Sequence, residues 1–465
     1  MSHEAPAPEG RVLATLHEDG TRRWLYPRVS RGPWLRARRI VAYGLIAVFT
    51  LLPYVYIGGK PAVLLNIPAR EFTLFGFTFL PTDTVLLALF LVSLVVGIFL
   101  ATALLGRVWC GWMCPQTVYM EFVYRPIERF FTGPPKAGHR PGKKSGPLRK
   151  VLMYATFLAI SCFLAHTFLA YFVGVENLAR WVRQSPLEHP IPFLVMVATT
   201  AAMMFDFCFF REQTCLVACP YGRFQSVMLD RDSLIVSYDE RRGEPRGKRG
   251  KKHRGDGELG DCIDCGLCVD TCPTGIDIRD GLQLECVACT QCIDACAHVM
   301  DRIGKPRGLI RLSSQARIAG EPGRLLRPRV ILYPAVMAVL VTAFLVVLLN
   351  KKSADVVLLR GMGLPFMEST PGEITNHIRV KIKNRGTEEA AYRVEVADRP
   401  EAVLMTNENP IRVAPGEFRT ESVFVVLPRS AFVNGTCYVT LWISDDNGFS
   451  KNLSFPLLGP RGGSS

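Results

Sequence analysis

Long apolar stretches alternate with short polar loops over the part of the chain that precedes residue 350. Five of these stretches are long enough, or nearly so, to cross a bilayer, which requires about 20 residues. Five such runs are too many for the buried core helices of a water-soluble protein, so the pattern predicts a helical membrane domain. The predicted spans are Ile40–Ile57, Thr84–Leu105, Val151–Val173, Ile191–Phe210 and Val330–Leu349.

After the last span the pattern changes to the alternation of half-buried β-strands. Ile378, Val380 and Ile382 alternate with basic residues, which turns one face of a strand toward a core. Short strands separated by turn residues at this spacing predict an immunoglobulin-like β-sandwich. Cys437 is its only cysteine, so we expect no disulfide between the sheets. The other predicted strands are Tyr392–Val396, Ile411–Val413, Ser422–Leu427, Thr436–Ile443 and Leu453–Leu457.

The chain has 55 Lys and Arg against 41 Asp and Glu, a formal charge of +14. The distribution of the basic residues along the chain is more informative than the total charge. Eight arginines precede the first span and nine basic residues lie between spans two and three, whereas the first and third connecting loops hold two each. Because Lys and Arg concentrate in cytoplasmic loops, this alternation predicts a cytoplasmic N-terminus, a cytoplasmic segment between spans four and five, and a C-terminal domain outside.

Eight of the fifteen cysteines lie in two runs between spans four and five. Each run reads C-x2-C-x2-C-x3-C, the spacing of bacterial ferredoxins that hold two [4Fe–4S] clusters. Zinc sites usually show CxxC pairs about 15–20 residues apart, and the uneven placement does not match a disulfide scaffold. In ferredoxins the fourth cysteine of a run ligates the other cluster. We therefore expect one cluster on Cys262, Cys265, Cys268 and Cys296, and the other on Cys286, Cys289, Cys292 and Cys272.

Two further cysteine pairs form an internal repeat at the ends of spans two and four. Cys110 and Cys114 form one CxxxCP motif, and Cys215 and Cys219 form the other. Cysteines at i and i+4 share one helix face. The proline after each pair disfavours helix at the residue before it, so the chain is predicted to turn there. Packing cysteines near a helix end are the alternative interpretation. Four thiols at one membrane face instead predict a metal or redox site, suited to Cu(I), zinc or another iron–sulfur cluster.

Three polar residues lie within the predicted spans: Cys162, His166 and Asp206. Ionisable groups are costly in a bilayer, so each raises the hypothesis of a ligand or proton-relay role. Cys162 and His166 share one helix face, but a hydrogen bond to a neighbouring helix would also account for the histidine. Asp206 has Arg211 nearby as an ion-pair partner. Their roles stay open at this point.

Residues 241–254 hold eight basic residues together with Gly and Pro, and no apolar anchor. Nucleic-acid binding is one interpretation of such a run. Beside a membrane span, a solvated tether that also contacts anionic lipid is favoured. We therefore expect the bilayer, and no nucleic acid, as the partner of this segment.

In combination, the twin CxxxCP pairs, the double ferredoxin run, the five spans and the C-terminal sandwich resemble the CcoG/FixG/RdxA family. The resemblance covers nearly the whole chain. The membrane part is also similar to NapH-type ferredoxin membrane proteins, which share the twin CxxxCP signature but generally lack the sandwich. One departure from the ferredoxin pattern is Ala297, where proline follows the fourth cysteine of a run. All eight ligand cysteines are present, so only the local loop geometry differs.

The resemblance implies a bacterial inner-membrane protein that reduces Cu(II) to Cu(I) for the assembly of cbb3-type cytochrome c oxidase. Copper, as substrate or bound ion, would be handled by the four CxxxCP cysteines. The implied partners are oxidase assembly factors or copper chaperones and an unidentified electron donor, with a homodimer left open. Two rival functions remain: a NapH-like conduit that carries electrons from quinol to a redox partner, and a non-enzymatic assembly scaffold with structural clusters.

The sequence thus predicts a multi-domain membrane protein with an α-helical bundle, a two-cluster ferredoxin domain and an immunoglobulin-like β-sandwich. The predicted segments are a cytoplasmic tail at 1–39, four membrane helices at 40–210, a cytoplasmic segment with the second CxxxCP motif and the ferredoxin domain at 211–328, a fifth helix at 329–350, and a periplasmic sandwich at 351–465.

Overall fold

The computed structural model describes residues 14–17, 19, 21–79, 83–142, 146–247, 259–322, 327–350, 353–386 and 388–460. Residues 248–254 of the basic run at 241–254 therefore lie outside the described residues. The chain forms two compact units, Met1–Phe344 and Leu345–Ser465, which we describe one after the other.

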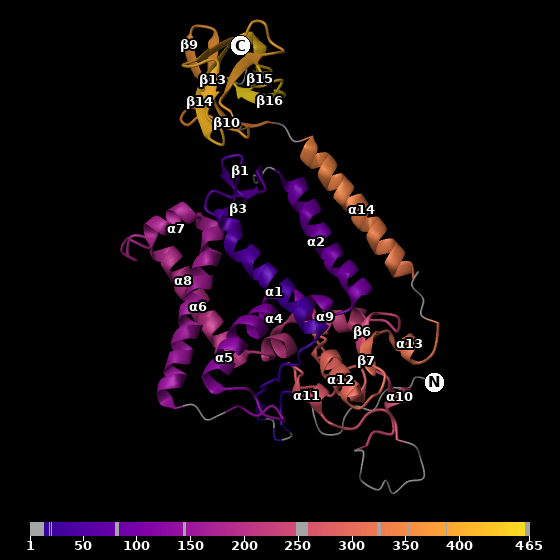
Figure 1. The fold of residues 1–465 in the computed structure, drawn as a ribbon. Coiled ribbons are helices and arrows are strands. Elements are labelled where there is room, and N and C mark those ends of the chain that lie inside the picture. The colour runs from indigo at the N-terminus through magenta and orange to yellow at the C-terminus, as the bar shows by residue number, and fades with distance from the viewer. Residues whose placement is uncertain are drawn as a thin grey trace. The chain divides into compact units, whose positions relative to one another are not determined.

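Four helices of the first unit are long and apolar enough to cross a membrane (Figure 1). They match four of the five predicted spans. Among the described residues, only 6% of the most apolar window of the helix at Thr84–Leu105 is buried inside the protein. For the helix at Pro328–Leu349 the buried share of that window is 0%. Apolar surface that the protein leaves uncovered requires lipid around it, so the chain is a membrane protein. The helices are α2 (Thr84–Leu105), α6 (Pro147–Val173), α8 (Pro190–Phe205) with its π-helical end η3 (Asp206–Phe210), and α14 (Pro328–Leu349).

The first predicted span, Ile40–Ile57, corresponds only in part to a helix. Helix α1 (Pro33–Leu51) begins earlier than predicted, and a 3-10 turn, η1 (Leu52–Tyr54), ends it. Three arginines in its first two turns lower its mean hydropathy, and α1 is not among the four candidate spans. A fifth membrane span therefore remains a prediction.

Short strands connect α1 to α2 and lie beside the C-terminal end of α6. The Tyr171 hydroxyl of α6 donates a hydrogen bond of 2.7 Å to the Phe49 carbonyl near the end of α1. Strand β3 also packs against α6. The strands are β1 (Tyr56–Ile57), β2 (Lys60–Pro61), β3 (Val63–Asn66), β4 (Glu71–Leu74) and β5 (Phe77–Phe79); helix α7 (Val175–Trp181) follows α6.

The ferredoxin region is a small core of loops and short helices around one two-stranded sheet. Its longest helix carries Asp294, whose carboxylate accepts hydrogen bonds from the Trp34 and Leu35 amides at the start of α1. Leu25 of the N-terminal segment is fully buried against Gly275. The elements are β6 (Ile235–Tyr238) paired antiparallel with β7 (Ile310–Ser313), and α10 (Glu240–Gly243), α11 (Leu267–Asp270), η5 (Ile278–Asp280), α12 (Gln291–Arg302) and α13 (Gln315–Ile318).

The second unit is a β-sandwich of two antiparallel sheets. The six predicted strands are present, and alternation places Ile378, Val380 and Ile382 in the fully buried core. Cys437 is a buried free thiol. One sheet has the order β12 (Val403–Thr406), β14 (Phe418–Pro428), β10 (Glu373–Asn384) and β8 (Ala354–Arg360), with β9 (Met367–Thr370) also on β10; the other has β13 (Ile411–Val413), β11 (Ala390–Val396), β15 (Thr436–Asp445) and β16 (Ser450–Leu458).

Candidate iron–sulfur and thiol site

Two cavities of the ferredoxin region are each lined by four of the predicted ligand thiols. All eight thiols are free, so no disulfide competes with cluster binding. Four soft thiolates on each cavity are the donor set that a [4Fe–4S] cluster takes, and the grouping agrees with the expected exchange of fourth cysteines. The first cavity is lined by Cys262, Cys265, Cys268 and Cys296. The second is lined by the other four, Cys272, Cys286, Cys289 and Cys292, and also by Cys268, which lines both.

The residue directly after the second cysteine of each run has a left-handed backbone conformation. It precedes the helix that carries the third cysteine. Gly266 has φ +69° and precedes α11, and Thr290 has φ +62° and precedes α12. Glycine adopts this conformation without steric cost. A β-branched threonine does so only where its surroundings impose it, and such residues cluster at functional sites. Thr290 is buried, and its hydroxyl donates to the Cys289 carbonyl at 2.7 Å.

The two CxxxCP motifs have the same backbone arrangement. The first cysteine of each pair lies in a single helical turn, whereas the second is extended, with φ −61° and ψ 127° at Cys114 and φ −76° and ψ 109° at Cys219. The proline then occupies the first position of a new helix, where its missing N–H has no cost. Each pair thus spans a turn instead of sharing one continuous helix face. The elements are α3 (Val108–Trp112), α4 (Pro115–Tyr119), the π-helical turn η4 (Thr214–Ala218) and α9 (Pro220–Met228).

The four CxxxCP thiols lie within electrostatic reach of one another. Cys215 interacts with all three others, and Cys110 interacts with Cys114 and Cys219. Burial raises the pKa of Cys110 to about 11 and that of Cys215 to about 12. Both are therefore neutral thiols at pH 7 until a bound cation displaces their protons. The structure brings the two motifs together, as the internal repeat predicts.

Among the described residues, these thiols are not gathered around the position of a single metal ion. In the described part of the chain, no group of three or more His, Cys, Asp or Glu side chains has the geometry to hold a single ion. A single ion bound by more than two of the CxxxCP thiols would therefore require these side chains to move inward. A four-iron cluster spans a larger site than one ion does.

The thiol site lies directly against the second ferredoxin run. Cys110 packs on Val287 and Cys289, and a Cβ atom at Gly111 would lie only 2.5 Å from the Val287 carbonyl oxygen. The almost fully buried Arg38 donates from Nε to the Gly111 carbonyl at 2.8 Å. These contacts hold the first CxxxCP motif at the wall of the second thiol-lined cavity.

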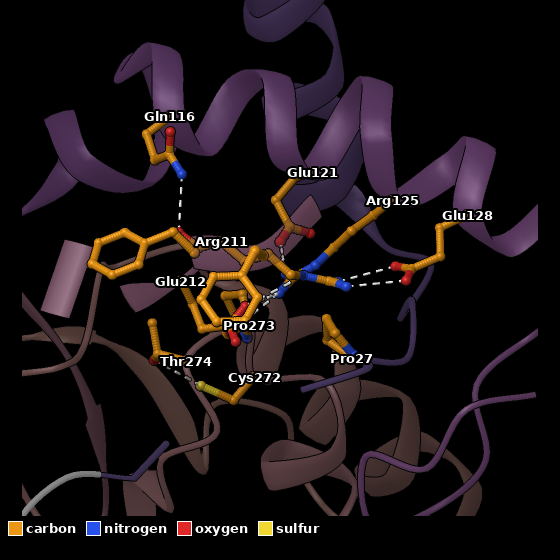
Figure 2. A network of polar contacts seen from close by, with 12 residues as sticks. Pro27, Gln116, Glu121, Arg125, Glu128, Arg211, Glu212, Cys272, Pro273 and Thr274 are labelled. Atoms are coloured by element: carbon orange, nitrogen blue, oxygen red, sulfur yellow. Dashed lines mark hydrogen bonds and ion pairs between the residues drawn. The ribbon is translucent and has the colours of Figure 1, made fainter. Parts of the chain in front are cut away.

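A buried network of charges connects both CxxxCP motifs to the first ferredoxin run (Figure 2). Arg125 pairs with Glu121 and, at 3.3 Å, with Glu212. Arg211 forms two parallel bonds of 3.0 Å to Glu128. Arg125 also lies 3.4 Å from the carbonyl of Pro273, which follows Cys272. The elements concerned are η2 (Met120–Tyr124), which carries Glu121, and α5 (Arg125–Thr132), which carries Arg125 and Glu128.

This network was not predicted from the sequence, and the predicted partner of Arg211 was wrong. The Arg211 guanidinium pairs with Glu128 and not with Asp206, whose carboxylate accepts a hydrogen bond from the Thr214 hydroxyl. His166 donates from Nδ1 to the Cys162 carbonyl of its own helix at 2.8 Å. This bond satisfies the imidazole within α6 and favours a structural role for it.

Three family models match the chain. Residues 210–315 match a 4Fe-4S dicluster domain, residues 87–134 match a 4Fe-4S binding domain, and residues 344–460 match the IG-like fold at the C-terminal of FixG. The first match contains both ferredoxin runs and the second CxxxCP motif, and the second match contains the first CxxxCP motif. Two iron–sulfur segments and one immunoglobulin-like domain therefore account for most of the chain.

Curated relatives match over most of their length. Protein RdxA of Cereibacter sphaeroides is 33% identical over 390 residues, which is 80% of this chain and 82% of RdxA. Nitrogen fixation protein FixG of Rhizobium meliloti is 30% identical over 505 residues, covering 97% of this chain and 96% of FixG. Protein RdxB of Cereibacter sphaeroides is 33% identical over 402 residues. A solved FixG-related protein from Vibrio parahaemolyticus aligns with 23% of this chain and 97% of its own at a TM-score of 0.21 and 16% identity.

Proposed function

The chain belongs to the FixG/RdxA family and is an iron–sulfur electron-transfer protein, and on this basis we propose that it is a membrane-bound cupric reductase. Its product, Cu(I), would serve the maturation of a cbb3-type cytochrome c oxidase, delivered through assembly factors or copper chaperones. The observation that carries the proposal is the position of Cys110 directly against the second ferredoxin run, with the other three CxxxCP thiols close by.

The chain's own residues divide the work of this reaction. When bound, [4Fe–4S] clusters supply one-electron redox chemistry, which is the stoichiometry that Cu(II) requires to become Cu(I). The CxxxCP thiolates bind copper and favour its soft Cu(I) state. Gly111 and Arg38 keep the thiols close to the second ferredoxin run. The eight ferredoxin cysteines Cys262, Cys265, Cys268, Cys272, Cys286, Cys289, Cys292 and Cys296 are the proposed cluster ligands.

Proton release accompanies copper binding in this proposal. Burial holds Cys110 and Cys215 as neutral thiols, so a copper ion displaces their protons when it binds. The reduction step itself adds one electron to Cu(II) and needs no general acid or base. Burial of the site also limits the access of water to the bound Cu(I).

The proposal is tested by replacing the four CxxxCP cysteines with serine in the full-length protein. We expect Cu(II) reduction, driven by dithionite under anaerobic conditions, to be lost while the visible absorbance of the clusters is retained. Cys437→Ser is the matched control, because this buried thiol lies in the sandwich. Unchanged Cu(II) reduction in the fourfold variant would overturn the assignment.

A second candidate function for the same four thiols is ligation of a further cluster. It is favoured by the 4Fe-4S match at residues 87–134 and because the described thiols are not gathered around the position of a single metal ion. Iron analysis separates the two candidates, since two clusters give about eight iron atoms per chain and three give about twelve. Loss of about four iron atoms in the fourfold serine variant would support the further cluster and contradict copper binding at these thiols.

A further inference from the structure

A cavity of about 230 Å³ lies where the start of α6, the end of α8 and the N-terminal segment meet. It is separate from the two thiol-lined cavities of the ferredoxin region and contains none of the predicted ligand cysteines. A cavity of about 150 Å³ is enough to hold a benzene ring, so this one has room for a substituted aromatic ring. Six aromatic side chains line it: Trp24, Tyr26, Tyr124, Tyr154, Phe157 and Phe207.

The aromatic walls are packed as flat surfaces. Tyr124 stacks on Phe207 with ring centroids 4.1 Å apart, and Phe157 meets Tyr124 edge-on at 5.1 Å. The Tyr124 hydroxyl is satisfied by Ser161 at 2.7 Å, which fixes the orientation of the ring. Flat, rigid walls of this kind favour a planar aromatic ligand.

A few polar groups complete the lining: Arg125, Glu128 and Arg211 (Figure 2). Arg125 is almost fully buried, and its Nε has no hydrogen-bond partner among the described residues. A buried donor without an acceptor is costly, which points to a ligand oxygen in the cavity. Because the two arginines already pair with carboxylates, a neutral ligand fits better than a phosphate headgroup.

The cavity lies at the end of the membrane spans and opens toward their surface. Tyr154 and Phe157 belong to the first turns of α6, and Phe207 belongs to the last residues of the Pro190–Phe210 span. Trp24 and Tyr154 are 38% and 48% exposed. A lipid-soluble ring can therefore enter from the bilayer side.

One layer of side chains separates this cavity from the thiol site. Met120, Arg125 and Arg211 line it and also line a second, smaller cavity, whose other walls include Cys215 and Pro273. Cys215 is one of the CxxxCP thiols, and Pro273 follows the cluster-ligand candidate Cys272. A ligand in the aromatic cavity is thus adjacent to both redox sites.

We propose that the aromatic cavity binds the headgroup of a membrane quinol and is the entry point for electrons. This inference rests on the proposed cupric reductase function. The two O–H bonds of one quinol break to give the quinone, and its two electrons reduce two Cu(II) ions to two Cu(I). The Glu128 carboxylate accepts the protons, which then pass to water at this face of the membrane.

A second lipid-level cavity, of about 160 Å³, provides an internal comparison. It is lined by His166, Trp181 and His189 at the opposite end of α6 and α8. His166 lies thirteen residues beyond Met153 of the first cavity in α6, which is about 20 Å along the helix. The first cavity adjoins the thiol site, so a cavity about 20 Å away from it along α6 is the weaker candidate for an electron entry site. It therefore serves as the control.

The test measures binding of a fluorescent quinol analogue, heptyl-hydroxyquinoline N-oxide, to the full-length protein in lipid nanodiscs without copper. We expect Trp24→Ala and Tyr154→Ala to weaken binding about tenfold each, because each removes one aromatic wall at an exposed position. Trp181→Ala should change the affinity less than about twofold. Iron content and far-UV circular dichroism verify that every variant is folded and loaded.

Equal affinity in all variants, or loss only in Trp181→Ala, would overturn the quinol site. Dithionite-driven Cu(II) reduction is measured in parallel, because it bypasses the cavity. Retained Cu(II) reduction together with unaltered analogue binding in Trp24→Ala and Tyr154→Ala would reject the quinol site alone. Absence of Cu(II) reduction in the unmodified protein would reject the proposed function instead.

Discussion

Gly111 holds the first CxxxCP motif close against the second ferredoxin run. A Cβ atom there would lie 2.5 Å from the Val287 carbonyl oxygen and 2.9 Å from the carbonyl of Ala288. Both atoms belong to the backbone of the second ferredoxin run, so neither can rotate away. We predict that Gly111→Ala destabilises the protein by about 1–3 kcal/mol and slows Cu(II) reduction at least about tenfold while the cluster absorbance is kept.

The matched control for this change is Gly44→Ala in α1, where no atom lies within 4 Å of the added methyl group. Alanine should be neutral or slightly stabilising there, because glycine has the greater conformational entropy in the unfolded chain. Stopped-flow reduction of Cu(II) and thermal unfolding measure the two effects. Equal rates for both variants would show that close contact at Gly111 does not control electron transfer.

At the scale of residues, the sequence predicted the thiols but not the groups that position them. The cysteine spacing is local, so the two thiol quartets and the paired CxxxCP motifs could be inferred from it. Arg38 and Arg107 could not, because their carbonyl partners, Gly111 and Leu284, are 73 and 177 positions away. Only the folded chain shows that these two arginines connect the two redox sites.

At the scale of elements, Asp294 connects the ferredoxin region to the membrane domain. Its carboxylate accepts hydrogen bonds from the Leu35 amide at 2.8 Å and the Trp34 amide at 3.3 Å, and α1 has no N-cap side chain of its own. A carboxylate at a helix N-terminus satisfies free N–H groups and complements the helix dipole. We predict that Asp294→Ala lowers the free energy of unfolding by about 1 kcal/mol.

Asp301→Ala on the same helix is the control, since its carboxylate pairs with Arg307 at the surface. That change should leave the free energy of unfolding unchanged within the precision of a thermal melt, because a solvent-exposed ion pair contributes little. Limited proteolysis after residue 32, together with thermal melts, reports whether α1 detaches. If Asp301→Ala lowered the free energy of unfolding as much as Asp294→Ala does, the capping role of Asp294 would be contradicted.

The charge network between the CxxxCP helices also contributes to the free energy of unfolding. Arg125 and Glu212 are 2% and 4% exposed at their side chains, whereas the pair of Arg231 and Glu321 is 67% and 52% exposed. Removal of one partner of a buried pair leaves an uncompensated charge and costs about 3–5 kcal/mol. We predict that Arg125→Gln lowers the free energy of unfolding by this amount and that Arg231→Gln lowers it by at most about 0.5 kcal/mol. Thermal unfolding in detergent measures both changes. Similar losses in both variants would show that burial does not govern this network.

Apolar runs and β-alternation predicted five spans, four of which match candidate membrane helices, and six sandwich strands, but not the irregular elements. Strands β8, β9 and β12 were missed; β8 and β12 lie at the edges of their sheet, and β9 pairs only with β10. The helix breaks at Cys114 and Cys219 lie where the following prolines predict them, since each cysteine is extended. The start of α1 was misplaced because its cap is supplied by a residue some 260 positions away.

At the scale of the molecule, three contacts within the first unit support α1 as a fifth membrane span. Its start is capped by Asp294 of the ferredoxin region, and its end lies beside Tyr171 near the far end of α6. The end of α2 returns to the ferredoxin side, where Gly106 lies against Leu234. Nineteen residues give α1 a length of about 28 Å, close to the roughly 30 Å hydrocarbon core.

Because α14 is the one candidate span between them among the described residues, we expect the ferredoxin region and the sandwich to lie on opposite sides of the membrane. The distribution of Lys and Arg predicts that the ferredoxin region is cytoplasmic, where reducing conditions protect clusters and thiols. Arg307→Cys and Tyr438→Cys introduce thiols at exposed positions of the two regions, 68% and 63% accessible. In spheroplasts, we expect a membrane-impermeant maleimide to label Tyr438→Cys at once and Arg307→Cys only after lysis, each against the background of the native cysteines. Reversed labelling would invert the orientation, and labelling of both before lysis would mean that α14 does not cross the membrane.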